Sequence, residues 1–177
     1  MAGTFIGIGV GPGDPELITI KAAKALKAAD VICVPKSHAH KQSMALSMVK
    51  QILAEREKPA EILELVFPMT KDELNNRKLW VENAAIVATK AKKGNVVFIT
   101  LGDPMLYSTF LYLYECVKET YPEIELEIIP GVTSVTAAAA SSKLPWQKKR
   151  KWFQLFHQIL PQLALKKPPN TLITWCS

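Results

Sequence analysis

Short apolar runs rich in β-branched residues alternate with helical patterns along the first 142 residues of the chain. Residues 4–10 form the first strand-like run, and residues 19–29 then place alanines and a leucine at the spacing of one helical face. Apolar strands that alternate with helices are typical of a parallel sheet covered by helices on both faces. The pattern therefore predicts one α/β domain with a five-stranded, mainly parallel sheet, and it leaves the strand order open.

The boundaries of the expected elements follow from the same periodicity and from the residues that cap or end them. Ser43 is suited to cap the second helix, and Pro35 and Pro68 are expected to end the second and third strands. The expected strands span residues 4–10, 31–34, 62–67, 96–100 and 126–129. The expected helices span residues 19–29, 44–56, 109–119 and 134–141, with one further long helix after Asp72.

The alternating pattern stops at Pro145, and the composition changes there. Residues 146–177 contain no Gly, Asp or Glu, hold three of the four tryptophans, and carry six basic residues that account for the whole net charge of +6. The charge therefore describes this segment and not the globular part, for which we expect no nucleic-acid partner and no membrane partner. We favour a segment of foreign origin, such as the product of a shifted reading frame. The alternative is a basic amphipathic helix for a membrane surface or an acidic partner.

Membrane insertion, disulfides and metal binding find little support in the sequence. No run approaches the roughly 18 apolar residues that a membrane span needs, and the N-terminus has no basic segment ahead of its apolar run. The three cysteines are far apart and form no CxxC pair. His38 and His40 have no third ligand nearby in the sequence, so we expect exposed loop histidines. The expectation is a cytoplasmic chain without a metal site.

Three unusual turns follow the first, fourth and fifth expected strands. They span residues 9–15, 102–108 and 130–134, and they combine glycines with prolines or small hydroxyl residues. Such turns expose backbone N–H and C=O groups, and ligands of open parallel sheets bind at the carboxyl ends of the strands. One such turn alone would be an ordinary connection, but three at these positions predict a small-molecule site.

The glycine run near the N-terminus does not fit the two common nucleotide motifs. A G-x-G-x-x-G fingerprint that begins at Gly9 needs a glycine at position 14, where Asp14 stands. A phosphate-binding loop needs a Gly-Lys pair, and the sequence has none. Asp14 and Asp103 would also repel phosphates at close range. The turns therefore predict a ligand that is not held by its phosphates.

Three segments of the chain resemble the signatures of the tetrapyrrole methylase family, in order and in spacing, over about residues 3–145. They read GIGVGPGDPELITIKAAKALKAADVICVPKS, GDPMLYSTFLYL and IIPGVTSVTAAAA. The strings VPKS, FPMTKD and YSTF are most similar to the branch that methylates C20 of precorrin-2 or cobalt-factor II in cobalamin biosynthesis.

The resemblance implies an enzyme of two α/β domains, usually a homodimer, with S-adenosylmethionine bound in the trough between the domains. The activated methyl group would pass to C20 of the tetrapyrrole, while the protein supplies alignment and excludes water. Asp103 has the right charge for the sulfonium, and its alternative role is to cap a helix that begins near Met105. By motif, the implied cofactor residues are Pro12, Gly102, Asp103, Met105, Ser108, Thr133 and Ser134.

The residues that would carry the proton chemistry are not identified by the motifs. Tyr107 and Asp14 are candidates for a proton relay, and Lys36 is a candidate for contact with the carboxylates of the substrate. Each has an ordinary structural alternative, and for Lys36 that alternative is a solvated residue at a strand end. The catalytic base stays unassigned.

The chain departs from the family after the third signature. The family continues through a second α/β domain, whereas residues 146–177 show no such resemblance. We therefore predict a family domain over residues 1–145, a basic tail over residues 146–177, and weak or absent methyl transfer by this chain alone. Two alternatives remain. One is another tetrapyrrole methylase, acting on a different corrin carbon or on uroporphyrinogen III, and the other is a non-catalytic module that binds through its basic tail.

Overall fold

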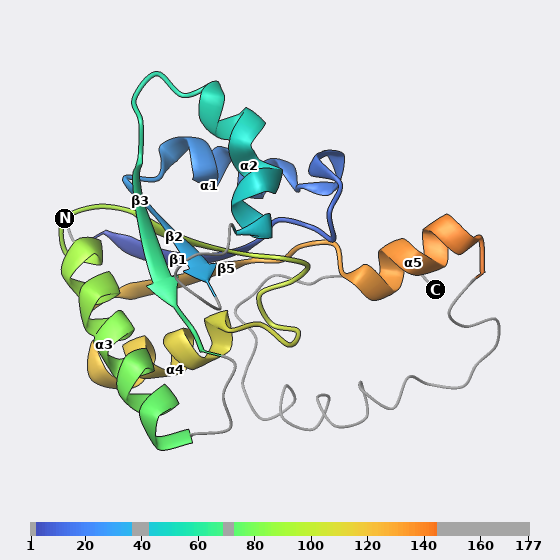
Figure 1. The fold of residues 1–177 in the computed structure, drawn as a ribbon. Coiled ribbons are helices and arrows are strands. Elements are labelled where there is room, and N and C mark those ends of the chain that lie inside the picture. Colours follow the sequence, from blue (N-terminus) through green and yellow to red (C-terminus); the bar gives the residue numbers. More distant parts are fainter. Residues whose placement is uncertain (1–2, 37–42, 69–72, 145–177) are drawn as a thin grey trace, which may run out of the picture.

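The computed structural model describes residues 3–36, 43–68 and 73–144, which contain a five-stranded sheet (Figure 1). Its strand order is β3-β2-β4-β1-β5, and all neighbouring strands are parallel. The predicted α/β fold and the five-stranded parallel sheet are therefore confirmed. The strands are β1 (Thr4–Gly9), β2 (Val31–Lys36), β3 (Glu61–Val66), β4 (Val96–Thr100) and β5 (Glu125–Ile129).

Helices α1 and α2 cover one face of the sheet, and α3 and α4 cover the other (Figure 1). Thr19 caps α1 and Ser43 caps α2, each through a hydroxyl oxygen that accepts a backbone N–H three residues later. The cap predicted at Ser43 is confirmed, whereas Asp72 lies outside the described residues. The helices are α1 (Ile20–Ala28), α2 (Met44–Ala54), α3 (Glu73–Ala91), α4 (Phe110–Thr120) and α5 (Ser134–Ser142), with a short 3-10 turn at Pro15–Leu17.

The chain leaves the neighbouring strands β1 and β4 in opposite directions across the sheet. From β1 it passes through α1 to β2, and from β4 it passes through α4 to β5, which lies on the far side of β1. Such a reversal opens a crevice at the carboxyl ends of the two strands, where open α/β sheets bind their ligands. The helical and strand periods could not predict this order, because they carry no information on strand pairing.

Strand β2 runs two residues further than the predicted span of 31–34 and includes Pro35. The pairing of β2 with β4 stops at Cys33, whereas its pairing with β3 continues to Lys36. Pro35 therefore lies where β2 has a single neighbouring strand, and its missing backbone N–H costs no bond to β4. The prediction that Pro35 ends the strand was wrong for this reason.

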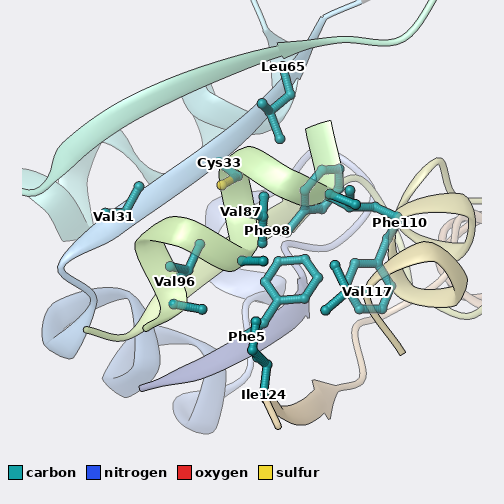
Figure 2. Close-up of a cluster of buried hydrophobic side chains, with 14 of the residues drawn as sticks. Phe5, Val31, Cys33, Leu65, Val87, Val96, Phe98, Phe110, Val117 and Ile124 are labelled. Carbon is teal, nitrogen blue, oxygen red and sulfur yellow. The ribbon is translucent and has the colours of Figure 1, made fainter. Parts of the chain in front are cut away.

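Phe110, the first residue of α4, anchors that helix on the sheet (Figure 2). Its side chain is fully buried, and its ring centroid lies 5.6 Å from that of Phe5 and 5.7 Å from that of Phe98. A Cβ atom at Gly7 would lie 2.2 Å from the Phe110 ring, so only glycine lets the ring rest on β1. This packing fixes the start of α4 and the position of the turn that precedes it.

Helix α5 has no buried residue and projects from the edge of the sheet where the strands end (Figure 1). Thr133 caps its start by accepting the backbone N–H of Thr136 at 3.3 Å. Lys143 closes its end in the left-handed backbone conformation, as helix C-caps often do. Local hydrogen bonds therefore define this helix, and burial against the sheet does not. Among the helices of the described ranges, none is long and apolar enough to cross a membrane.

Candidate functional site

The three predicted turns meet at one edge of the sheet, beside the crevice between β1 and β4 (Figure 1). The backbone N–H of Gly102 donates to the carbonyl oxygen of Gly11 at 2.8 Å, which joins the turn after β4 to the turn after β1. The backbone N–H of Gly131 donates to a carboxylate oxygen of Asp103 at 2.9 Å, which joins the turn after β5 to the same assembly. The predicted convergence of the turns is confirmed.

Three glycines make this convergence possible, because their backbones touch. A Cβ atom at Gly9 would lie 2.3 Å from the carbonyl oxygen of Gly102, and one at Gly131 would lie 2.1 Å from the same oxygen. Gly102 itself has φ +67°, a backbone conformation that residues other than glycine rarely adopt. Any larger residue at position 9 or 131 would push the turns apart, so the sequence needs glycine there for close approach.

Asp103 organises the assembly through both oxygens of its carboxylate. Oδ2 accepts the N–H of Gly131, and Oδ1 accepts the N–H of Met105 at 2.8 Å. The helix expected near Met105 begins at Phe110 instead, so Asp103 closes a turn and does not cap a helix. A carboxylate accepts about four hydrogen bonds, so Asp103 keeps acceptor capacity for a ligand.

Ser108 is buried, and its hydroxyl serves the start of α4. It donates to the hydroxyl oxygen of Thr100 at 2.9 Å and accepts the backbone N–H of Phe110 at 3.1 Å. The hydroxyl of Ser108 thus ties the end of β4 to the start of α4. Its predicted contact with the cofactor stays a prediction, and its hydroxyl is hydrogen-bonded within the protein.

The remaining predicted cofactor residues lie around the same edge with different exposure. Pro12 is half-buried between Gly11 and Gly13, both of which have positive φ. Met105 is about half exposed, and Ser134 is exposed at the first turn of α5. Thr133 is half-buried, and its hydroxyl oxygen caps α5. The structure therefore brings the seven residues to one edge of the sheet, and their contact with a cofactor stays a prediction.

A cavity of about 290 Å³ lies beside these turns, at the carboxyl ends of β2 and β4. Ser108 is the one predicted cofactor residue in its lining. Thr100 and the start of α2 could not be assigned to a site from the sequence, since only the strand order makes β2 and β4 neighbours. The lining residues are Pro35, Lys36, Ser43, Met44, Ala45, Thr100, Leu101, Tyr107, Ser108 and Thr109.

Two residues of this cavity carry charge or strain. The ammonium of Lys36 lies 2.6 Å from a carboxylate oxygen of Glu64 on β3, and the Lys36 side chain is largely buried. Tyr107 has φ +51° and a fully exposed side chain. Residues held in such a backbone conformation cluster at functional sites, because the surrounding structure must offset a cost of roughly 1–3 kcal/mol.

The part of the chain that the structure describes contains no cluster of side chains suited to bind a metal ion. No group of three or more His, Cys, Asp or Glu side chains there could hold a metal ion. His38 and His40 lie outside the described residues. Burial among apolar side chains raises the pKa of the Cys33 thiol to about 12, so Cys33 packs as a small apolar residue (Figure 2).

The sequence of the chain matches a known protein family along nearly its whole length. The sequence model described as Tetrapyrrole (Corrin/Porphyrin) Methylases matches residues 4–173. The chain belongs to this family. The match runs beyond residue 145, and the predicted boundary between a family domain and a basic tail stays a prediction.

Two similar tetrapyrrole methylases act, by name, on the same substrate class. The chain is 42% identical over 139 residues to the probable cobalt-precorrin-2 C(20)-methyltransferase of Methanocaldococcus jannaschii, which covers 78% of this chain and 57% of the relative. It is 39% identical over 166 residues to the cobalt-precorrin-2 C(20)-methyltransferase of Salmonella typhimurium. This alignment covers 93% of this chain and 68% of the relative. The chain therefore spans between about half and about two thirds of the length of these relatives.

A solved structure of the family shows the same fold with a bound nucleoside. It is the uroporphyrin-III C-methyl transferase of Thermus thermophilus complexed with S-adenyl homocysteine, 27% identical, with a TM-score of 0.53. The alignment covers 84% of this chain and 55% of that one. The described domain of this chain thus has the fold of a tetrapyrrole methylase.

Proposed function

We propose that this chain supplies the N-terminal domain of an S-adenosylmethionine-dependent methyltransferase that acts on C20 of precorrin-2 or cobalt-factor II. The observation that carries the proposal is the meeting of three glycine turns at the crevice between β1 and β4. It occurs in a chain that is 42% and 39% identical to two C20-methyltransferases. The edge formed by these turns is the half of the cofactor trough that this domain supplies.

The chemistry of the turns suits a sulfonium nucleoside. Residues 9–15, 102–109 and 130–134 contain two carboxylates, Asp14 and Asp103, and no Lys, Arg or His. Carboxylates and backbone carbonyl oxygens attract a positive charge, whereas they repel the phosphates of nucleotides. S-adenosylmethionine, when bound, supplies an activated methyl group, and the chain only has to hold and align it.

The seven predicted cofactor residues divide into two roles in this proposal. Gly102, Pro12 and Met105 offer backbone groups and apolar contact at the crevice, and Ser134 offers an exposed hydroxyl. The other three residues keep the turns in place, because their side chains are hydrogen-bonded to the protein. Those positioning residues are Asp103, Ser108 and Thr133.

The tetrapyrrole would lie next to the cavity at the ends of β2 and β4. Lys36 lies in its wall and could meet a carboxylate of the substrate in exchange for, or together with, its bond to Glu64. Tyr107 offers a fully exposed ring and a phenol at the same wall. Tyr107 and Asp14 stay candidates for the proton relay, and the base that removes the C20 proton is unassigned.

Binding of S-adenosylhomocysteine tests the proposed cofactor site. We expect measurable heat in calorimetric titration of the full chain with S-adenosylhomocysteine. Gly131→Ala should weaken binding at least about tenfold, because a Cβ there lies 2.1 Å from the carbonyl oxygen of Gly102. Ser141→Ala, exposed at the far end of α5, is the matched control and should bind as the parent chain does. No binding by the parent chain, or equal binding by Gly131→Ala, would contradict the site.

Methyl transfer by residues 1–177 on their own is expected to be weaker than by the relatives, because these residues span between about half and about two thirds of the relatives' length. Turnover should be measured with precorrin-2, cobalt-factor II and uroporphyrinogen III, side by side with an intact two-domain relative. A preference for uroporphyrinogen III would favour the alternative methylase, and turnover equal to that of the relative would contradict the expectation of weaker transfer. Translating the downstream DNA in the other two frames tests whether residues 146–177 arose from a frameshift. Recovery of family-like sequence there would support that origin, and its absence would exclude it.

The cellular setting and assembly follow from the same proposal. We expect a cytoplasmic protein whose intact form is a homodimer, and sedimentation velocity of the intact relative and of this chain tests the assembly. The alternative of a non-catalytic module predicts binding to nucleic acid or to anionic vesicles that falls steeply with salt. Loss of such binding when residues 146–177 are deleted would favour that alternative.

A further inference from the structure

The cavity at the carboxyl ends of β2 and β4 has the opposite charge to the turns beside it. Among the described residues that line the cavity, Lys36 is the only charged one. The turns over residues 9–15, 102–109 and 130–134 contain Asp14 and Asp103 and no basic residue. The crevice is therefore acidic at the turns and basic in the adjoining cavity.

The ammonium of Lys36 is fixed by an ion pair at the wall of the cavity. Only 12% of the Lys36 side chain is exposed, and its ammonium lies 2.6 Å from a carboxylate oxygen of Glu64 on the edge strand β3. Glu64 is not among the described residues of the lining, and 51% of its side chain is exposed. The cavity therefore meets the cation of this pair, while the carboxylate of the pair faces solvent. An ammonium carries three donors, so a bond to Glu64 does not by itself exclude a second carboxylate.

A second polar group of the cavity, the hydroxyl of Thr109, makes no capping bond although Thr109 stands at the N-cap of α4. The hydroxyl residues at the N-caps of α1, α2 and α5 each accept a backbone N–H of their own helix. At α4 the neighbouring Ser108 holds the start of the helix instead, because its hydroxyl accepts the N–H of Phe110 at 3.1 Å. The half-buried Thr109 thus brings to the cavity a hydroxyl that the helix does not use.

We propose that this cavity is the subsite for one carboxylate side chain of the tetrapyrrole, with Lys36 as its cation and Thr109 as its hydroxyl donor. The inference rests on the proposed function, because that function supplies a substrate that carries many carboxylates. Hydrogen bonds from an ammonium or a hydroxyl to a carboxylate are charge-assisted, which makes them roughly twice as strong as bonds between neutral groups.

The size of the cavity fits a side chain of the substrate and not the macrocycle. Its volume is about 290 Å³. Pockets that enclose a whole drug-sized ligand start at about 300 Å³ and reach about 1,000 Å³. The ring of the tetrapyrrole therefore stays outside the cavity, on the side of the turns.

One segment of the chain contributes to both the acidic turns and the basic cavity. Residues 102–109 place Asp103 in the assembly of turns and Thr109 in the lining of the cavity. The two regions of opposite charge are thereby kept at a fixed separation. Complementary charges fix the register of a bound partner more than they add to its affinity. The carboxylate subsite would accordingly determine which part of the macrocycle lies nearest to the cofactor.

Absorbance titration of the full chain with cobalt-factor II tests the cation of the subsite. Lys36→Met removes the charge at similar length and should weaken binding about tenfold or more. Glu64→Gln removes a carboxylate that competes for Lys36 and repels the ligand, so it should tighten binding about two- to threefold. Both substitutions break the same ion pair. A purely structural role of the pair would therefore weaken binding in both variants, whereas the subsite predicts opposite directions.

The hydroxyl of the subsite is tested by two substitutions at Thr109. Thr109→Val keeps the shape and should weaken binding of cobalt-factor II about tenfold, because it removes a hydrogen bond to a charged group. Thr109→Ser restores a hydroxyl and should recover most of that loss. Urea denaturation should give the same midpoint for both variants, since the helix does not use this hydroxyl as a cap.

The matched controls break a similar ion pair that lies outside the cavity. Lys90 of α3 and Glu61 of β3 are also 2.6 Å apart, and neither is a described lining residue. Lys90→Met and Glu61→Gln should therefore bind cobalt-factor II within about twofold of the parent chain.

The outcomes separate this subsite from the cofactor site and from the assigned substrate. Unchanged binding of cobalt-factor II by Lys36→Met and Thr109→Val, or weaker binding by Glu64→Gln, would overturn the subsite alone. Equal weakening of S-adenosylhomocysteine and cobalt-factor II by Lys36→Met would overturn it too, because Lys36 would then act through the fold. If the parent chain binds no cobalt-factor II, the assigned substrate fails and the subsite fails with it. If the parent chain fails to bind only S-adenosylhomocysteine, the cofactor site fails and the subsite stands.

Discussion

The carboxylate of Asp103 accepts the backbone N–H of Gly131 at 2.9 Å and so joins the turn after β4 to the turn after β5. Its other oxygen accepts the N–H of Met105 at 2.8 Å, within its own turn. One side chain therefore satisfies two backbone donors from different turns. Because Gly131 also touches the backbone of Gly9, the bond indirectly sets the distance between all three turns.

Asp103→Ala is expected to lower stability and ligand affinity together. Removing the carboxylate leaves two backbone N–H groups without their acceptor, which costs about 1–3 kcal/mol for each one that water cannot reach. Urea denaturation should show a lower midpoint with an unchanged slope, and calorimetry should show weaker binding of S-adenosylhomocysteine.

The matched control for Asp103 is Asp14→Ala. Asp14 also accepts a backbone N–H, that of Glu16 at 2.9 Å, but it does so at an exposed site and within one turn. Its loss should cost less than about 1 kcal/mol, because water replaces the bond. Equal destabilisation by the two substitutions would show that the bond to Gly131 does not link the turns.

Phe110→Ala is expected to destabilise the domain more than any surface change. Its ring fills the space over Gly7 and contacts Phe5 and Phe98, so truncation leaves a cavity and should cost about 3–5 kcal/mol. Tyr112→Ala is the control, because Tyr112 is 44% exposed and stacks on Trp80 of the neighbouring helix α3. It should cost on the order of 1 kcal/mol. Denaturation midpoints that rank the two variants in the reverse order would contradict the packing described for Phe110.

Much of the fold could be predicted from local sequence signals. Each strand and helix of the described ranges lies within a few residues of its predicted span, because periodicity and caps such as Ser43 act over neighbouring residues. The meeting of the turns could also be predicted, because parallel strands place all their carboxyl ends at one edge. The strand order could not be predicted. The cavity between β2 and β4 was missed with it, because Lys36 and Thr100 are far apart in the sequence.

The directions of side chains in the site could not be read from the sequence. A serine beside a glycine turn can hydrogen-bond to a ligand or to its own protein, and the sequence pattern is the same in both cases. The hydroxyl of Ser108 is hydrogen-bonded to the hydroxyl of Thr100 and to the backbone N–H of Phe110. Asp103 was expected to contact the cofactor or to cap a helix. It caps no helix but closes one turn and links it to another, and its contact with the cofactor stays a prediction. Pro35 was expected to end β2. The strand continues through Pro35 because the pairing of β2 with β4 has already stopped at Cys33.

Cys33 is expected to resist alkylation in the folded chain. Burial raises its pKa from an ordinary value of 9.0 to about 12, so it stays a protonated thiol at pH 8. Cys116 is partly exposed and should react before Cys33, although burial raises the pKa of Cys116 as well. Iodoacetamide labelling followed by peptide mass spectrometry should find Cys33 modified only after denaturation. Equal labelling of Cys33 in folded and unfolded chains would contradict its burial.

The same shift in the pKa of Cys33 predicts a dependence of stability on pH. The folded chain keeps the thiol proton that the unfolded chain loses above about pH 9, so unfolding releases a proton there. The contribution of the protonated Cys33 thiol to the free energy of unfolding is complete below pH 9 and is lost as the pH rises towards about 12. Cys33→Val removes the titrating group at similar volume, so its free energy of unfolding should fall less steeply over this range. Parallel curves for the two chains would contradict the prediction.

Tyr107→Gly is expected to stabilise the fold while it weakens ligand binding. Tyr107 holds φ +51° with a fully exposed side chain, so glycine relieves backbone strain of about 1–2 kcal/mol and removes no buried contact. Lys143→Gly is the matched control, because Lys143 has φ +55° at the exposed end of α5, away from the cavity. Both variants should unfold at higher urea concentration, and only Tyr107→Gly should bind the tetrapyrrole less tightly. Unchanged binding by Tyr107→Gly would mean that its strained backbone serves the turn alone.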